Sequence, residues 1–368
     1  MKIRSSLFLL SLFTASVDAF VSTGANGAQT RLSATALNAS SSTALKEGDA
    51  VLLIGPGFLQ LNVAKAAKAA GLKPIVVAPQ AKIDSFVPYV NDDEILKDAI
   101  IGIPDPGEPY YGEIGGVVYC AEDAVLPDSI ISTVLDWKDK EVFCPEGIKR
   151  AIGCIPISGK INKEKGMGWM PIFNNDKKEK DAWDAFTKAF KNHPVMKEEN
   201  QGTLIRFGSL LGGSNDGTEE LVPLALDERI YKMSLENYRD LKERSFDRYR
   251  IGAQVLKGDA VNPQPPNQIK MEKDAIKNGE QLEAFRAVGG YPEIDRTNRH
   301  TAAQAIVQAL MRPTSEVPKE FSILSKCESK LPTQAEWDEM FANPGAASWP
   351  DPFDWDPTKY GFEVETAN

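Results

Sequence analysis

VLLIGPGFLQLNVAKAAKAAGLKPIVVAPQ, residues 51–80, is an apolar run, a glycine turn, a helix-forming run and a second apolar run. Residues 51–54 are too few for a helix, and Gly55 and Gly57 close them. Residues 61–70 favour a helix with a small-residue face, which Gly71 ends as a C-cap. Residues 75–78 are then expected to form a second buried strand. The stretch therefore predicts a strand, helix and strand unit.

The turn in this unit is of the kind that binds dinucleotides. Glycines there let backbone N–H groups and the start of the helix face a pyrophosphate. The full fingerprint has a third glycine where helix and strand pack closely, and Gln60 stands at that position. Its side chain has to point away or push the helix out. Two interpretations remain open: a working dinucleotide site, or a scaffold of the same fold that has lost its ligand.

Strand and helix signals continue to alternate along the chain, which predicts an α/β fold with a doubly wound, Rossmann-like parallel sheet. Strands are expected at 114–120, 151–158 and 203–208, with a closing strand at 319–325. Helices are expected at 128–137, 181–191 and 301–311. In the second of these helices, Trp183, Phe186 and Phe190 have the spacing of a core face.

The first 46 residues read as targeting segments that precede the fold. Lys2 and Arg4 precede a short apolar run, and small residues lead to a cut after Ala19, so residues 1–19 predict a signal peptide. Residues 20–46 are rich in Ser, Thr and Ala, which is typical of a plastid transit segment. The setting of Phe20 resembles the two-part presequence of algae with secondary plastids. We expect import into the plastid stroma, with secretion as the alternative.

Composition excludes several classes of protein. A net charge of −10 argues against non-specific nucleic-acid binding, and no later segment is apolar enough to span a membrane. Four cysteines without a C-x-x-C spacing favour reduced thiols over a disulfide framework. His193 and His300 are isolated in sequence, so we expect no metal site.

Several motifs in order resemble the atypical short-chain dehydrogenase/reductase superfamily, and within it the NmrA-like NAD(P)-binding proteins. They are GPGFLQ after a strand, GIKRAIGCIPISGK, GTLIRFGSLLGG, RTNRHTAAQAIVQALMRP, the strand KEFSILS and a late helix around Trp337. The likeness covers about residues 48–341. It implies an NAD(P)-binding Rossmann-like domain at 47–341.

The resemblance also implies site residues. It places Gly55, Gly57, Phe58 and Gln60 on the phosphate turn, and Ala121 at a strand end beside the ribose and pyrophosphate. Phe207 and Gly208 fall near the nicotinamide, where Phe207 replaces the proline of the family's I-R-P-G. No acidic residue follows the second strand, whereas Lys82 can meet a 2′-phosphate, so NADP is preferred over NAD as cofactor.

Catalytic residues are harder to place. Short-chain dehydrogenases use Y-x-x-x-K, in which the lysine lowers the pKa of the tyrosine. The one match, Tyr238 with Lys242, comes after the 203–208 strand instead of before it, and a solvated helix face explains it better. The candidates that remain are Ser158, to polarise a carbonyl or to cap a turn, and Lys188, to bind a ribose or simply to be solvated.

An insertion and a tail complete the predicted organisation. Residues 219–290 hold charged helical stretches and a proline-rich linker, a helical insertion that can serve as a lid, a docking arm or a local core. Residues 342–368 form an irregular acidic tail rich in proline and aromatics. Either segment can contact a protein partner, besides the dinucleotide and a small-molecule substrate.

Two functional classes follow from the sequence. The first is a plastid NADPH-dependent oxidoreductase of a small or isoprenoid-like substrate. The second is a non-catalytic protein of the same fold that senses redox state or assembles photosynthetic complexes. Because a well-placed Y-x-x-x-K dyad is missing, we expect an NAD(P)-binding protein and leave turnover open.

Overall fold

The computed structural model describes residues 44–55, 57–87, 90, 94–97, 99, 110–122, 125–136, 140–157, 175–197, 201–213, 251–260, 296–326, 328 and 330–345. Residues 1–43 of the two predicted targeting segments, most of the 219–290 insertion and the tail beyond residue 345 lie outside these ranges.

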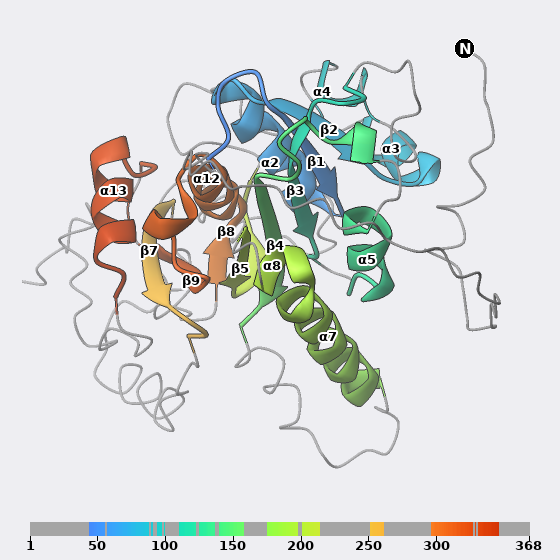
Figure 1. Cartoon of the computed structure of the whole chain (residues 1–368). Coiled ribbons are helices and arrows are strands. Elements are labelled where there is room, and N and C mark those ends of the chain that lie inside the picture. The colour runs from blue at the N-terminus through green and yellow to red at the C-terminus, as the bar shows by residue number, and fades with distance from the viewer. Residues whose placement is uncertain are drawn as a thin grey trace, which may run out of the picture.

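A seven-stranded sheet in the order β2-β1-β3-β4-β5-β9-β7 forms the centre of the described fold (Figure 1). All neighbouring pairs are parallel except β7 with β9, which is antiparallel. A mostly parallel sheet with helices on both faces is the predicted doubly wound α/β fold, which is confirmed. The strands are β1 Ala50–Ile54, β2 Lys73–Val77, β3 Ile114–Cys120, β4 Arg150–Pro156, β5 Gly202–Phe207, β7 Gly252–Lys257 and β9 Glu320–Lys326.

Helices cover both faces of this sheet. α2 and α12 pack side by side on one face, and α5 and α7 lie on the other (Figure 1). Trp183, Phe186 and Phe190 of α7 are buried against the sheet, as their spacing predicts. The helices are α2 Phe58–Ala69, α3 Gln80–Phe86, α4 Glu94–Lys97, α5 Ser129–Leu135, α7 Asn175–Asn192, α8 Pro194–Lys197, α12 Arg299–Leu310 and α13 Gln334–Ala342, with 3-10 turns at Lys140–Val142 and Thr314–Glu316.

The predicted helical insertion contributes a strand to the main sheet. Its residues Gly252–Lys257 form β7, which pairs with β9 at the sheet edge. A second, two-stranded sheet joins β6, Ser209–Leu211, to β8, Arg296–Asn298. The predicted insertion therefore lies between β6 and β8 in sequence. Its strand β7 contributes Ala253 and Val255 to the core.

Arg150 anchors α12 at the amino end of β4. Its Nε and Nη2 donate to Ala309 O at 3.0 and 2.7 Å, and Nη2 also donates to Thr203 Oγ1 at 3.1 Å. Burial lowers the pKa of Arg150 to about 10, which still leaves the side chain charged near neutral pH. A cation at the carboxyl end of α12 is also favoured by the helix dipole.

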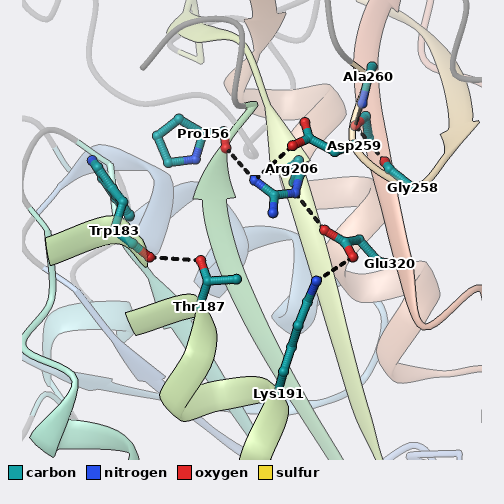
Figure 2. A network of polar contacts seen from close by, with 10 residues as sticks. Pro156, Trp183, Thr187, Lys191, Arg206, Gly258, Asp259, Ala260 and Glu320 are labelled. Carbon is teal, nitrogen blue, oxygen red and sulfur yellow. Dashed lines mark hydrogen bonds and ion pairs between the residues drawn. The ribbon is translucent and has the colours of Figure 1, made fainter. Parts of the chain in front are cut away.

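A polar network ties α7 to the second half of the sheet (Figure 2). Glu320 accepts from Arg206 Nε at 2.7 Å and from Lys191 Nζ at 2.6 Å. Arg206 also donates to Pro156 O at 3.1 Å and lies 3.4 Å from Asp259 Oδ2. Because Pro156 is the last residue of β4 and Arg206 the last but one of β5, this network reaches the carboxyl ends of these two strands.

The same network predicts an acid-dependent part of stability. Burial would raise the pKa of Glu320, but hydrogen bonds from Lys191 and Arg206 outweigh it and hold this pKa below its ordinary value of 4.5. The stabilisation is therefore present above pH 4.5 and is lost as pH falls through the lowered native pKa. Glu320→Gln should lower stability at pH 7 by about 1 kcal/mol and flatten the acid limb of melting temperature against pH. An unchanged acid limb would contradict this assignment.

Candidate functional site

The strand order changes direction between β1 and β3, and this switch point defines the candidate site. β1 pairs with β2 on one side and with β3 on the other, so that Ile54 lies level with both Val77 and Tyr119. In open α/β sheets, ligands bind outside the carboxyl ends of the strands at such a point. The glycine turn after β1 and the segment after β3 meet there.

Both glycines of the turn lie close to residues at or just after the end of β3. A Cβ on Gly55 would collide with the carbonyl oxygen of Cys120. A Cβ on Gly57 would collide with the carboxylate of Glu122. The glycines therefore let the start of α2 approach the end of β3, as the turn of a dinucleotide site requires.

A carboxylate already lies at the start of α2. Glu122 Oε2 accepts from the backbone N–H of Leu59 at 2.7 Å, and its Oε1 accepts from Arg299 Nε at 2.5 Å. The Glu122 side chain is 1% exposed and that of Arg299 13%. Arg299 also donates from Nη1 to Gly212 O at 2.7 Å. Segments from β3, α12 and the residues after β6 thus converge on the turn.

Gln60 fits the third glycine position in a way that the sequence did not predict. Its side chain neither points away nor leaves space for a ligand, because it is fully buried between α2 and the sheet. The amide Nε2 donates to Leu53 O at 2.5 Å and to Val77 O at 2.9 Å. The Gln60 side chain therefore joins α2 to β1 and β2, and the expected role of Gln60 in cofactor binding stays a prediction.

Two further predicted residues, Phe58 and Lys82, lie in α2 and α3. Phe58 is partly exposed, and its ring contacts that of Phe86 in α3 with centroids 5.7 Å apart. Lys82 is exposed in α3, which directly follows the end of β2. This is the position from which a cation can reach a 2′-phosphate, so the expected role of Lys82 stays a prediction.

Other predicted contacts lie at strand ends but face the core. Ala121 is fully buried directly after β3. Phe207 packs into the core on the α12 side, so its ring is part of the core. The Gly208 N–H donates to Thr297 Oγ1 at 3.1 Å, so this donor is used within the protein.

Of the two predicted catalytic residues, the structure describes only Lys188. Ser158 lies just outside them, and Lys188 is exposed on α7, away from the buried face of that helix. Of the tyrosines in the described ranges, Tyr119 lies nearest the strand ends. Its hydroxyl donates to Ile131 O at 3.4 Å, and burial raises its pKa well above 10. Tyr119 is therefore unsuited to exchange a proton with a substrate.

Sequence reasoning missed the polar pairs that fold into contact. Glu122 and Arg299 are 177 residues apart in sequence. The one hint in the sequence was that Glu122 comes two residues after a strand at the switch point. His193, which is isolated in sequence, bonds through Nε2 to Asp136 Oδ1 at 3.0 Å. Among the described residues, no cluster of three His, Cys, Asp or Glu side chains could hold a metal ion.

Comparison with known proteins assigns no family to this chain. No protein-family model matches the chain, and no curated protein matches it either. Among solved structures, the chain is similar to the crystal structure of the aureusimine biosynthetic cluster reductase domain. The identity is 12%, the TM-score is 0.39, and the match covers 81% of this chain and 77% of that one. No residue correspondence follows at that similarity.

Within the described residues, no helix has the length and apolarity needed to cross a bilayer.

Proposed function

We propose that this chain is an NAD(P)-binding protein that holds a nicotinamide dinucleotide across the carboxyl ends of β1 and β3. The observation that carries the proposal is the anion at the start of α2: the Leu59 N–H holds a carboxylate oxygen at 2.7 Å. This backbone donor is preorganised for an oxyanion, and a pyrophosphate oxygen has the same hydrogen-bonding requirement. The glycine turn and its place at the switch point support the same ligand class.

We further propose that the dinucleotide is bound without standard short-chain dehydrogenase turnover. The helix in the position of the catalytic helix, α7, carries no tyrosine, and its Lys188 is exposed. Tyr119, near the strand ends, is buried and hydrogen bonded. A proton relay of the Y-x-x-x-K type thus has no support in α7. A redox-responsive binding protein fits these residues better than a dehydrogenase does.

NADP is the proposed form of the cofactor. The end of β2 carries no acidic side chain for a ribose hydroxyl, and the exposed Lys82 follows it in α3. A lysine there pairs more strongly with a charged 2′-phosphate than with a 2′-hydroxyl. NADPH is therefore expected to bind more tightly than NADH.

Calorimetric titration of the full chain tests this function. We expect saturable heat with NADPH and NADP at up to millimolar concentrations, weaker heat with NADH, and no net oxidation of NADPH in the absence of added substrate. Adenosine, which lacks the pyrophosphate, serves as the control ligand and should give no comparable binding. The proposal fails if neither the wild-type chain nor Glu122→Gln binds any dinucleotide at millimolar concentration.

Plastid targeting belongs to the same proposal. Residues 1–19 and 20–46 have the composition of a signal peptide followed by a transit segment. A fluorescent protein fused behind residues 1–46 is expected to accumulate in the plastid of an alga with secondary plastids. Its appearance in the medium would support secretion instead.

A further inference from the structure

The position of Glu122 raises the question of what normally occupies the start of α2. Helix α2 has no acidic residue in its first turn, and its N-cap Gly57 offers no side-chain hydrogen bond. The exposed partial charge of such a helix end is usually met by a capping side chain or a bound anion. Here Glu122, which belongs to the segment after β3, supplies that anion through Oε2.

Glu122 and a pyrophosphate compete for the same donor. The Leu59 N–H points at Glu122 Oε2, and the carboxylate lies against Gly57, where a Cβ would have no room. A diphosphate placed at this turn would meet the carboxylate both sterically and as a like charge. The two anions therefore cannot occupy the start of α2 together.

Arg299 holds the carboxylate in place and supplies the countercharge. Its Nε donates to Glu122 Oε1 at 2.5 Å, while its Nη1 donates to Gly212 O at 2.7 Å. Asn298, which precedes it, caps α12 by accepting from the His300 N–H at 2.8 Å, so the backbone beneath Arg299 is fixed. A guanidinium in this position can pair with a carboxylate or with a phosphate.

We propose that Glu122 is an internal substitute for the pyrophosphate and that, with Arg299, it forms a latch that a dinucleotide must open to bind. The inference rests on the proposed function and names the control of that same site. When the latch opens, Glu122 leaves the Leu59 N–H and Arg299 transfers from the carboxylate to the diphosphate. No bond is made or broken in this exchange other than hydrogen bonds and ion pairs.

The latch reduces the apparent affinity by the fraction of molecules in which it is open. If about one molecule in 100 is open, the apparent Kd of wild-type protein is about 100-fold weaker than that of a chain without the latch. A site with this property responds to high concentrations of dinucleotide and discriminates against ligands that lack a diphosphate, because only a diphosphate replaces both contacts of Glu122.

The test compares NADPH and ADP binding to full-length wild type, Glu122→Gln and a matched control, Glu113→Gln. The glutamine keeps the size of Glu122 but removes the charge that pairs with Arg299. Glu113 is an exposed glutamate paired with Lys73 at the start of β3, remote from the turn. We expect at least about tenfold tighter binding of both ligands to Glu122→Gln and unchanged binding to Glu113→Gln.

A second variant separates charge from position. Glu122→Asp keeps the negative charge but shortens the side chain by one methylene, so its carboxylate no longer reaches the Leu59 N–H in the same geometry. It should also bind NADPH more tightly than wild type, and it provides the test if Glu122→Gln does not fold. Arg299→Met should not bind NADPH more tightly than wild type, because it removes the guanidinium that would pair with the diphosphate.

The outcomes distinguish the two proposals. Saturable binding of NADPH with equal affinity by wild type, Glu122→Gln and Glu122→Asp would overturn the latch and leave the proposed function intact. Absence of binding by all of them would overturn the proposed function, and the latch with it. Tighter binding by the Glu122 variants alone supports both.

Discussion

Arg299→Met is expected to lower the free energy of unfolding by about 3–5 kcal/mol, because it leaves the carboxylate of Glu122 buried without its cation. The Glu122 side chain is 1% exposed, so water cannot replace the lost partner without a rearrangement. The remaining N–H of Leu59 satisfies only Oε2. Urea unfolding of the full chain, followed by circular dichroism, measures the change.

A double-mutant cycle isolates the pair from the other contacts of Arg299. The loss for Glu122→Gln combined with Arg299→Met should be clearly smaller than the sum of the two single losses, because the double variant buries no unpaired charge. Lys73→Met is the matched control: it breaks an ion pair of 2.9 Å whose side chains are 46% and 51% exposed. That change should cost less than about 1 kcal/mol. Equal losses for Arg299→Met and Lys73→Met would contradict a buried, coupled pair.

Gly55→Ala is expected to destabilise the fold by about 2–3 kcal/mol through a backbone collision. The added Cβ would overlap the carbonyl oxygen of Cys120, and that carbonyl belongs to a strand held on both sides by β1 and β4. No side chain can rotate to relieve the contact, so β1 and β3 have to separate at their carboxyl ends. The midpoint of urea unfolding reports the loss.

Gly115→Ala is the control for this substitution. It also adds a Cβ next to the central sheet, but the nearest atom is Leu45 Cδ2 at 3.1 Å, the far end of a flexible side chain. Its cost should stay under about 1 kcal/mol, because Leu45 can adjust. If Gly55→Ala were as stable as Gly115→Ala, the close approach of the turn to β3 would be wrong.

The central fold could be predicted from local patterns in the sequence. The apolar run 51–54, its glycines and the helix that follows correspond to β1, the turn and α2, because period and turn chemistry act over a few residues. The strand 114–120 is β3 to the residue, and α7 presents the aromatic face that its spacing predicts. β7 was missed because six residues within a charged, helix-like stretch carry too weak a strand signal.

The candidate site was less predictable, because its chemistry depends on contacts between distant segments. In the sequence, Gln60 stands where the dinucleotide-binding motif has its third glycine. In the fold, its amide donates to two carbonyl groups, on β1 and β2, that only the folded sheet brings together. The position of Glu122 just after β3 was visible in the sequence, but its pairing with Arg299 was not. Their pairing over the turn depends on where β3 ends and α12 begins, and no local pattern encodes that distance.

A crystal structure of the full chain with NADPH tests the central claim most directly, through the atom that lies within hydrogen-bonding distance of the Leu59 N–H. We predict a pyrophosphate oxygen about 3 Å from that nitrogen, with Glu122 displaced and Arg299 turned to the phosphate. A dinucleotide bound elsewhere, with the Glu122 carboxylate still on the Leu59 N–H and on Arg299, would contradict the account.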